Sequence, residues 1–296
     1  MNNGTAIGAD IGGSHITVSA VDRYTKKLIM ESWIRKTVDS TAGAEEIFDL
    51  WANALSESIA VSNSTIECIG IAMPGPMDYK NGICLIRDQQ KFQSLYGMNI
   101  GKQLARRLNF APEKILFMND AACYLKGELY SGSVKDFSSA IGVTLGTGLG
   151  TSHTSGGEAM DSALWNMSFQ DGISEDYLST RWFVKRFEEI GGQKIRDVKD
   201  LIERYKASPH FKTVFAEFSL NLARFLYLFI EIKKPQAAVI GGNIANADAY
   251  FLEETNRQLF RMLGYSFPVR RSALGESAAL IGAASLGNIN EGVKLW

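Results

Sequence analysis

Apolar residues follow two patterns of spacing that alternate along this chain. Short apolar runs with β-branched residues predict strands. These runs cover residues 6–10, 16–21, 28–35, 67–73, 115–118, 139–145 and 237–240. Apolar residues three and four positions apart predict amphipathic helices. They cover residues 41–62, 100–108, 121–130, 175–190, 198–206, 211–233, 249–263 and 275–287. Because strands and helices alternate, the sequence predicts an α/β protein.

The pattern of the first half restarts in the second half. Residues 7–14 read Ile-Gly-Ala-Asp-Ile-Gly-Gly-Ser, and residues 141–148 read Ile-Gly-Val-Thr-Leu-Gly-Thr-Gly. One repeat at this separation is typical of two similar domains rather than of a solenoid. We therefore expect an N-terminal domain of residues 1–119 and a C-terminal domain of residues 120–296, packed around a cleft. The last helix, about 275–296, is expected to pack on the first domain.

The charge of the chain excludes one class of partner. Lys and Arg number 31 against 32 Asp and Glu, so the net charge is −1. Bulk nucleic-acid binding needs clustered positive charge, so we expect no nucleic-acid partner. The three cysteines, at positions 68, 84 and 123, lie too far apart for a disulfide framework and suit a reducing compartment.

The most apolar stretch, residues 211–232, does not predict a membrane span. Glu217, Arg224 and Glu231 interrupt it, so a buried helix is expected. No signal-like segment is visible after Met1. We expect a soluble, cytoplasmic protein with no membrane partner. The charged run 194–206 alternates in sign and predicts a solvated helix face.

Glycine is over-represented, with 28 residues in 296 where average usage gives about 21. Three clusters each follow a predicted strand: Gly12-Gly13, Gly146–Gly150 and Gly241-Gly242. Glycine in such turns lets backbone N–H groups approach an anion without an intervening Cβ. No Walker loop is present and the dinucleotide fingerprint is incomplete. The clusters therefore predict a phosphate-binding scheme of another type.

Five motifs in order resemble the ROK family of sugar kinases and repressors. They are Asp10-Ile-Gly-Gly-Ser-His-Ile, Gly70-Ile-Ala-Met-Pro-Gly-Pro-Met-Asp78, Asn119-Asp-Ala-Ala-Cys-Tyr-Leu-Lys-Gly-Glu128, Gly146-Thr-Gly-Leu-Gly150 and Val239-Ile-Gly-Gly-Asn243. The resemblance spans residues 7 to about 285. It implies two similar domains of the actin-like ATPase (ribonuclease H-like) fold around a central cleft.

The resemblance also implies roles for the acidic residues. Asp120 would be the general base that takes the proton of the sugar hydroxyl, and Asn119 and Gly75 would lie at the sugar. Asp10 would be the carboxylate that meets Mg²⁺. Each acidic motif has a structural alternative, because Asn119-Asp120 can cap the next helix and Asp10 can stabilise the glycine turn.

The resemblance also implies that the glycine clusters form the nucleotide side. The phosphates of ATP would face two turns, and the adenosine would face a third. The residues are Gly12, Gly13, Ser14, Gly146, Thr147 and Gly148 for the phosphates, and Gly241, Gly242 and Asn243 for the adenosine side. His15 stands where the family commonly has Lys, and a neutral imidazole is a weaker phosphate partner.

The sugar side departs from the family pattern. Where the family has Glu-x-Gly-His, this chain has Ala163-Leu-Trp-Asn166, so Ala163 replaces the Glu and Asn166 replaces the His. Asn166 and Glu175 would contact the sugar, although Glu175 can simply begin a helix. Trp165 is either a platform for a sugar face or a core residue, with the core favoured. The Cys-rich zinc segment of the family is missing, so no zinc is expected.

Taken together, the resemblance implies an ATP-dependent kinase that phosphorylates a hexose, at O6 of glucose or a related aldohexose. The alternatives are an N-acyl amino sugar kinase, acting on N-acetylglucosamine or N-acetylmannosamine, and a non-catalytic sugar-sensing regulator. Only nine residues precede Asp10, so we expect no helix-turn-helix domain before it. A homodimer is a common state of the family, although the apolar pattern marks no interface. His153 and His210 are isolated and are expected to be structural or surface residues.

Overall fold

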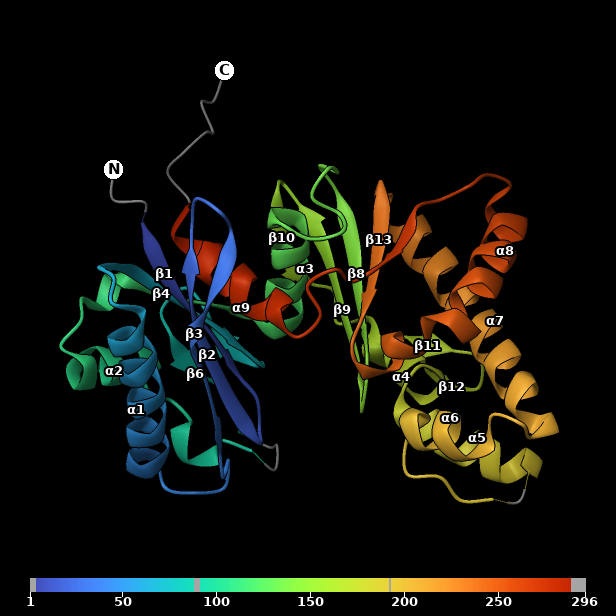
Figure 1. The fold of residues 1–296 in the computed structure, drawn as a ribbon, viewed down its shortest axis with the longest axis horizontal. Coiled ribbons are helices and arrows are strands. Elements are labelled where there is room, and N and C mark those ends of the chain that lie inside the picture. The colour runs from blue at the N-terminus through green and yellow to red at the C-terminus, as the bar shows by residue number, and fades with distance from the viewer. Residues whose placement is uncertain (1–3, 88–90, 192, 289–296) are drawn as a thin grey trace. The chain divides into compact units, whose positions relative to one another are not determined.

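The computed structural model describes residues 4–87, 91–191 and 193–288. The chain forms two compact units (Figure 1). The first contains the residues up to Gly132 together with those from Glu276 onward, and the second contains Ser133–Gly275. The sequence predicts a domain boundary at 119/120, whereas the first of these compact units also includes the helix that follows residue 119, because this helix packs against the helix that follows residue 276. Of the final helix expected at 275–296, residues 289–296 lie outside the described residues.

The first unit is built on a five-stranded mixed sheet. Its strand order is β3-β2-β1-β4-β7. The strands are β1 (Thr5–Ile11), β2 (His15–Asp22), β3 (Lys27–Thr37), β4 (Ile66–Met73) and β7 (Ile115–Asn119). β1 pairs antiparallel with β2 and parallel with β4, which pairs parallel with β7. The helices of this unit are α1 (Ala44–Ser62), α2 (Ile100–Leu108), α3 (Asp120–Tyr130) and α9 (Ser277–Ala284).

The second unit repeats this sheet topology with order β10-β9-β8-β13-β14. The strands are β8 (Ala140–Leu145), β9 (Leu149–Ser155), β10 (Glu158–Asp161), β13 (Ala237–Gly241) and β14 (Val269–Arg271). β8 pairs antiparallel with β9 and parallel with β13. The helices are α4 (Ser174–Tyr177), α5 (Thr180–Gly191), α6 (Val198–Tyr205), α7 (Pro209–Lys233) and α8 (Leu252–Leu263). The prediction of an α/β protein with an internal repeat is confirmed.

Short elements complete the described chain. Two small hairpins are formed by β5 (Met77–Asp78) with β6 (Ile83–Cys84), and by β11 (Ser168–Phe169) with β12 (Gly172–Ile173). The 3-10 helices are η1 (Gln93–Leu95), η2 (Pro112–Lys114), η3 (Leu164–Asn166), η4 (Asn243–Tyr250) and η5 (Ser285–Asn288). The helix predicted at 175–190 is divided into α4 and α5, and the one predicted at 249–263 begins as η4. Strands β9 and β10 were missed because residues 150–158 are almost entirely polar or glycine.

Helix α7 runs through the core of the second unit. Within the described residues it is the one helix that is long and apolar enough to cross a membrane. Phe218, Leu222 and Phe225 on this helix are nevertheless fully buried. Phe218 contacts the ring of Phe183 on α5, and Phe225 contacts the ring of Phe169 on β11. This arrangement fits the buried helix predicted from its interrupting charges.

Helix α9 reaches its place in the first unit through glycine contacts. A Cβ at Gly282 of α9 would lie 1.9 Å from the carbonyl oxygen of Cys123 on α3, and one at Gly127 of α3 would lie 2.0 Å from that of Ala278. Two glycines in strands β1 and β4 make equally close contacts with α9: Gly8 and Gly70. Backbones can approach this closely only where no side chain stands between them. Glycines of β1, β4, α3 and α9 itself therefore allow α9 to lie this close to the sheet and to α3.

Candidate active site

Three polar residues gather at one edge of the first sheet. Strands β1, β4 and β7 are parallel, so their carboxyl ends lie at the same edge, where ligands commonly bind in open α/β sheets. Asp10 precedes the last residue of β1, Asn119 ends β7, and Asp120 begins α3. In register, Asp10 is paired with Ala72 and Asn119 with Met73. The structure thus brings together two carboxylates that are far apart in the sequence.

The two carboxylates affect each other electrostatically. Burial, and next the charge of Asp120, raise the pKa of Asp10 from 3.8 to about 7, while Arg35 opposes this shift. A buried carboxyl group beside a second carboxylate is ionised more readily when a further positive charge lies close to it. A divalent cation would supply that charge, so the residues present fit Mg²⁺, which proteins commonly hold through one or two carboxylates and the substrate phosphates. Within the described residues no group of three or more His, Cys, Asp or Glu is arranged to hold a metal.

Asn119 is anchored on both sides of its amide. Its Oδ1 accepts a hydrogen bond from the backbone N–H of Ala122 at 3.2 Å, so Asn119 is the N-cap of α3. Its Nδ2 donates to the phenol oxygen of Tyr79 at 3.3 Å, and this phenol donates to the carbonyl oxygen of Met73 at 3.0 Å. A Cβ at Gly75 would lie 3.2 Å from the same phenol oxygen. Tyr79, which the sequence analysis did not single out, therefore connects the Gly75 loop to Asn119.

The turn between β1 and β2 contains the first glycine cluster. The N–H of Gly12 donates to the carbonyl oxygen of His15 at 2.9 Å, and the Ser14 hydroxyl lies 2.9 Å from Nδ1 of His15. Protein neighbours do not require the glycines, because a Cβ at Gly12 or Gly13 would find no atom closer than 3.5 Å. The space beside this turn is consistent with a backbone left bare for a ligand.

The second glycine cluster forms the loop between β8 and β9. The carbonyl oxygen of Gly146 accepts hydrogen bonds from both N–H and hydroxyl of Thr180, at 2.8 and 2.9 Å. The carboxylate of Glu175 accepts from the N–H of Leu149 at 3.0 Å and pairs with Arg181. A Cβ at Gly148 would lie 2.6 Å from that carboxylate. Glu175, in the first turn of α4, therefore supports this loop through its side chain.

The third cluster follows β13. Gly242 adopts φ 83°, and a Cβ there would lie 2.3 Å from the carbonyl oxygen of Leu145 at the end of β8. Only glycine combines this left-handed conformation with so close an approach. Gly241 ends β13, and Asn243 begins η4 beside it. The turn therefore lies directly against the strand that leads into the Gly146 loop.

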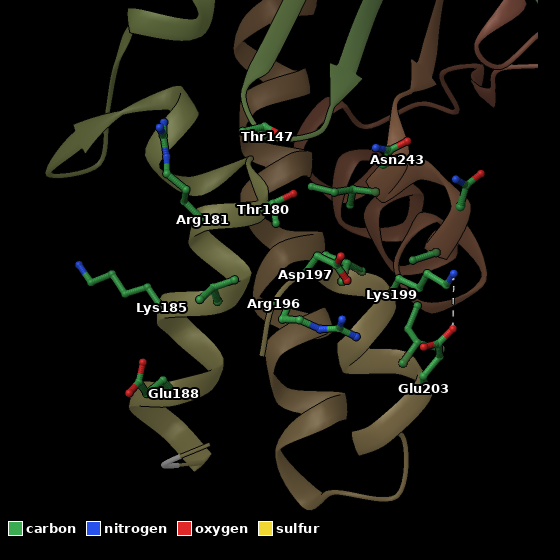
Figure 2. Close-up of a pocket in the computed structure, with 16 residues that line it drawn as sticks. Thr147, Thr180, Arg181, Lys185, Glu188, Arg196, Asp197, Lys199, Glu203 and Asn243 are labelled. Carbon is green, nitrogen blue, oxygen red and sulfur yellow. Dashed lines mark ion pairs between the residues drawn. The ribbon is translucent and has the colours of Figure 1, made fainter. Parts of the chain in front are cut away.

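A cavity of about 1090 Å³ opens beside these two loops in the second unit (Figure 2). Thr147 and Asn243 contribute one residue from each loop, and Thr180 adds a hydroxyl. The rest of the lining comes from α5, from α6 and the two residues before it, and from η4: Arg181, Val184, Lys185, Glu188, Arg196, Asp197, Val198, Lys199, Ile202, Glu203, Ile244, Asn246 and Ala247. Figure 2 shows Thr147 and Asn243 toward one end of the cavity and Glu188 and Glu203 toward the other.

The segment expected at the sugar is short and exposed. Asn166 ends η3 and is exposed, and Ala163 before it has φ 49°. Trp165 is 43% exposed, so the expectation that it is a core residue is wrong. His153 has a structural contact, as expected, because its ring lies 2.8 Å from the Ser162 hydroxyl.

Comparison with known protein families identifies the family of this chain. A model of the ROK family matches residues 6–162 and 170–289. The chain belongs to the ROK family. The resemblance of the five motifs is therefore confirmed, and the two repeated sheets are those of the actin-like ATPase fold of this family.

Relatives within the ROK family are similar over nearly the whole chain. A glucokinase of Thermotoga maritima is 24% identical over 95% of this chain and 96% of its own length. An N-acetyl-D-glucosamine kinase of Shigella boydii is 23% identical over 94% of this chain and 98% of its own length. A ROK family glucokinase from Streptomyces griseus, solved in complex with glucose and AMPPNP, superimposes with a TM-score of 0.75 at 21% identity and covers 96% of this chain and 99% of its own.

Sequence reasoning missed most of the residues that line the cavity of this ROK protein. The charged run 194–206 was interpreted as a solvated face, which is wrong for Asp200, whose side chain is fully buried. Arg196 belongs to the same run and lines the cavity. Charges that alternate along a helix carry no signal of which one turns inward, so the sequence alone offered no means to find them.

Proposed function

We propose that this chain is a sugar kinase that transfers the γ-phosphate of ATP to a hydroxyl of a hexose. The observation that carries the proposal is the pair of carboxylates Asp10 and Asp120 at the carboxyl edge of the first sheet, with Asn119 beside them. The ROK relatives named as glucokinase and N-acetyl-D-glucosamine kinase support the same class of reaction.

In this proposal Asp120 is the general base. Its Oδ1 accepts a hydrogen bond from the N–H of Ala121 at 2.9 Å, which orients the carboxylate at the start of α3. The carboxylate takes the proton of the sugar hydroxyl as that oxygen attacks the γ-phosphate. Asn119 binds the sugar through the amide N–H that does not donate to Tyr79, since Nδ2 carries two N–H groups. Gly75 lies next to this pair and completes the sugar side of the first unit.

Asp10 would hold Mg²⁺. The ion, when bound, neutralises charge on the phosphates of the donor. For the chain itself, the crowding of Asp10 and Asp120 disfavours two ionised carboxylates, so the site is arranged to gain from a cation.

The nucleotide side of the proposal is the cavity of the second unit together with the glycine turns. Gly146, Thr147 and Gly148 receive the phosphate end, and the Gly241-Gly242-Asn243 turn faces the adenosine. Gly12, Gly13, Ser14 and His15 are proposed as phosphate-facing residues of the first unit. Apolar side chains along the cavity suit a purine ring: Val184, Val198, Ile202, Ile244 and Ala247.

For the acceptor we propose glucose or a related aldohexose, phosphorylated at O6, with Asn166 and Glu175 as further sugar contacts. The relative named as an N-acetyl-D-glucosamine kinase favours an N-acyl amino sugar as the second candidate. The replacement of the family Glu by Ala163 removes a carboxylate that would accept a hydrogen bond from a sugar hydroxyl, and it leaves more room for a substituent on the sugar. The choice between an aldohexose and an N-acyl amino sugar therefore depends on this segment.

A coupled assay of ADP release over glucose, mannose, N-acetylglucosamine and N-acetylmannosamine tests the proposal. Turnover with one of them is expected, and Asp120→Asn is expected to lower kcat by at least about 100-fold, because general base catalysis contributes about that much. The amide keeps an oxygen for the Ala121 N–H, so the variant retains its fold. Asp49→Asn, an exposed carboxylate of the same unit, serves as the control. Absence of turnover with every sugar, or an unimpaired Asp120→Asn, contradicts the proposal.

A further inference from the structure

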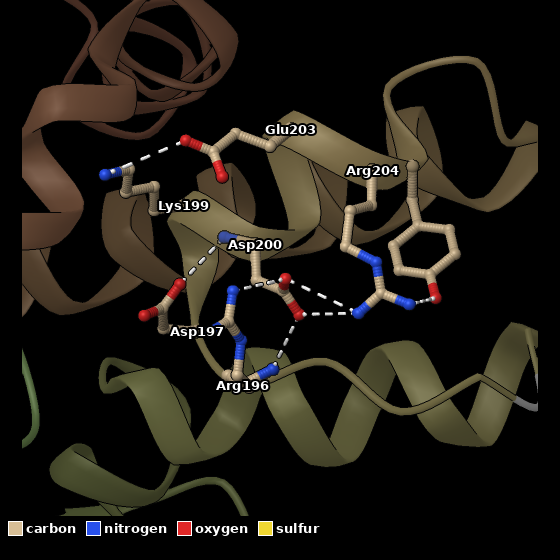
Figure 3. Close-up of polar contacts among 7 residues, drawn as sticks. Arg196, Asp197, Lys199, Asp200, Glu203 and Arg204 are labelled. Atoms are coloured by element: carbon tan, nitrogen blue, oxygen red, sulfur yellow. Dashed lines mark hydrogen bonds and ion pairs between the residues drawn. The ribbon is translucent and has the colours of Figure 1, made fainter.

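A buried carboxylate organises the start of α6 (Figure 3). The side chain of Asp200 is fully buried, and its Oδ2 accepts a hydrogen bond from the backbone N–H of Arg196 at 3.0 Å. Its Oδ1 accepts from Nη2 of Arg196 at 3.0 Å, and Nη1 of Arg204 lies 3.2 Å from Oδ2. The Asp197 carboxylate caps the helix by accepting from the Asp200 N–H at 2.8 Å. The buried carboxylate of Asp200 thus holds two guanidinium groups, and the Asp197 carboxylate balances the second of these positive charges.

The two arginines differ in what else they contact. Arg204 donates to the phenol oxygen of Tyr205 at 2.8 Å and packs against its ring. Arg196 lines the cavity that holds Thr147 and Asn243 (Figure 2). Its side chain is 79% exposed. Among the described residues, the Arg196 guanidinium donates one hydrogen bond, to the carboxylate of Asp200. A guanidinium carries five N–H donors, so Arg196 has several donors available on the cavity side.

The hydrogen bonds to Asp200 also fix the orientation of Arg196. The backbone N–H and a side-chain N–H of Arg196 both donate to the Asp200 carboxylate, which restricts the Arg196 side chain. Neither hydrogen bond covers the planar face of the guanidinium. A planar, weakly hydrated guanidinium that is already oriented stacks on an aromatic ring or donates to its nitrogen atoms at a reduced entropic cost. The neighbouring lining residues Val198 and Ile202 supply an apolar surface for the same ring.

We propose that Arg196 contacts the nucleoside of the phosphoryl donor and that Asp200 is the residue that positions it. This inference rests on the proposed function and adds a nucleotide-recognition pair outside the glycine turns. The phosphate end is assigned to Thr147 and the adenosine side to Asn243, so a guanidinium farther along the same cavity meets the base or ribose. The role differs from that of a phosphate-binding lysine, because planarity and orientation matter as well as charge.

Calorimetric binding of ADP and of tripolyphosphate, together with steady-state kinetics, tests the proposal. Arg196→Ala is expected to weaken ADP about tenfold, as for the loss of one such contact, and to leave tripolyphosphate binding unchanged. In kinetics KM for ATP rises while kcat and KM for the sugar do not change. Arg196→Lys recovers only part of the affinity because it lacks the planar group. Asp200→Asn raises KM for ATP by a smaller factor, since Arg196 remains present but is held less firmly.

Arg204→Ala is the matched control, because it removes the other arginine from the same carboxylate without touching the cavity. It is expected to leave ADP binding unchanged. Equal losses in Arg204→Ala and Arg196→Ala indicate a structural effect and overturn the inference, as does unchanged ADP binding by Arg196→Ala or an equal loss for tripolyphosphate. A wild-type protein that binds no ADP refutes the proposed use of ATP itself, whereas a wild-type enzyme with an unaffected Arg196→Ala variant refutes only this inference.

Discussion

The carboxylate of Glu175 accepts a hydrogen bond from the backbone N–H of Leu149 at 3.0 Å. This contact joins the start of α4 to the Gly146–Gly150 loop, and Arg181 pairs with the same carboxylate. The resemblance to the ROK family implies that Glu175 lies at the sugar, with a helix-start residue as the alternative. Its contacts in the structure give Glu175 a second role, the support of the loop proposed to bind phosphate.

Glu175→Ala is therefore expected to raise KM for ATP and to lower kcat, together about tenfold or more in kcat/KM, because a hydrogen bond to a charged group contributes about 1.5–3 kcal/mol. Steady-state kinetics with both substrates measures the change. Glu231→Gln, which alters an exposed ion pair on α7, is the control and leaves both constants unchanged. A rise in KM for the sugar alone would show that loop support is not its role.

Asp10→Asn is expected to stabilise the metal-free protein near pH 8. The folded protein ionises Asp10 against a pKa raised to about 7, a cost of up to about 4 kcal/mol relative to the unfolded chain. The amide avoids this cost. Urea unfolding in a buffer with a chelator measures the gain, and the same variant is expected to need more Mg²⁺ for activity. A variant less stable than the wild type in the chelator shows that Asp10 is not strained by its surroundings.

Gly282→Ala is expected to destabilise the first unit by about 3 kcal/mol or more, at the upper end of overpacking substitutions. The added Cβ would lie 1.9 Å from the carbonyl oxygen of Cys123 and 2.8 Å from the N–H nitrogen of Gly127, and neither backbone atom can move freely. Gly43→Ala is the control, because a Cβ there meets nothing within 4 Å. Thermal unfolding compares the two, and equal melting temperatures would refute the close packing of α9 on α3.

His153 is expected to make stability depend on pH. Burial, followed by the charge of Lys233, lowers the pKa of His153 from 6.5, and Nζ of Lys233 lies 3.1 Å from Nε2 of the ring. The unfolded chain then binds the proton more readily, so stability is complete above pH 6.5 and falls as pH drops through the lower folded pKa.

Urea midpoints from about pH 8 to about pH 5 measure this dependence. His153→Gln is expected to flatten the decline on the acidic side, whereas His210→Gln is expected to keep it. Identical slopes for the wild type and His153→Gln would mean that other groups cause the decline.

Much of the fold could be predicted from local patterns. The apolar run before Asp10 and the three glycine clusters fall at strand ends, and α2 begins and ends at the predicted residues. These features are local, since a strand or amphipathic helix is encoded by its own residues. Strands β9 and β10 were missed because an edge region rich in Ser, Thr and Gly lacks the alternation that marks a half-buried strand.

The parts of the site that depend on packing could not be predicted. The mutual influence of Asp10 and Asp120 requires the strand order β1-β4-β7, which no local pattern encodes. Asp200 looks like its exposed neighbours in the sequence, and only the fold of the segment before α6 turns it inward to Arg196. The three glycine clusters could be located because each directly follows a short apolar run, and Gly242 is also required by its positive φ.

The close packing of α9 against glycines of the first unit has a consequence for the order in which the chain folds. The ribosome delivers residues from the N-terminus, and α9 emerges only after the whole of Ser133–Gly275 has been made. The second unit is one uninterrupted stretch, so it can complete its fold while the first sheet still waits for the helix that covers Gly8 and Gly70. The unit that is synthesised first is thus the one that is finished last, and its exposed sheet face is the part of the nascent chain most in need of protection from aggregation.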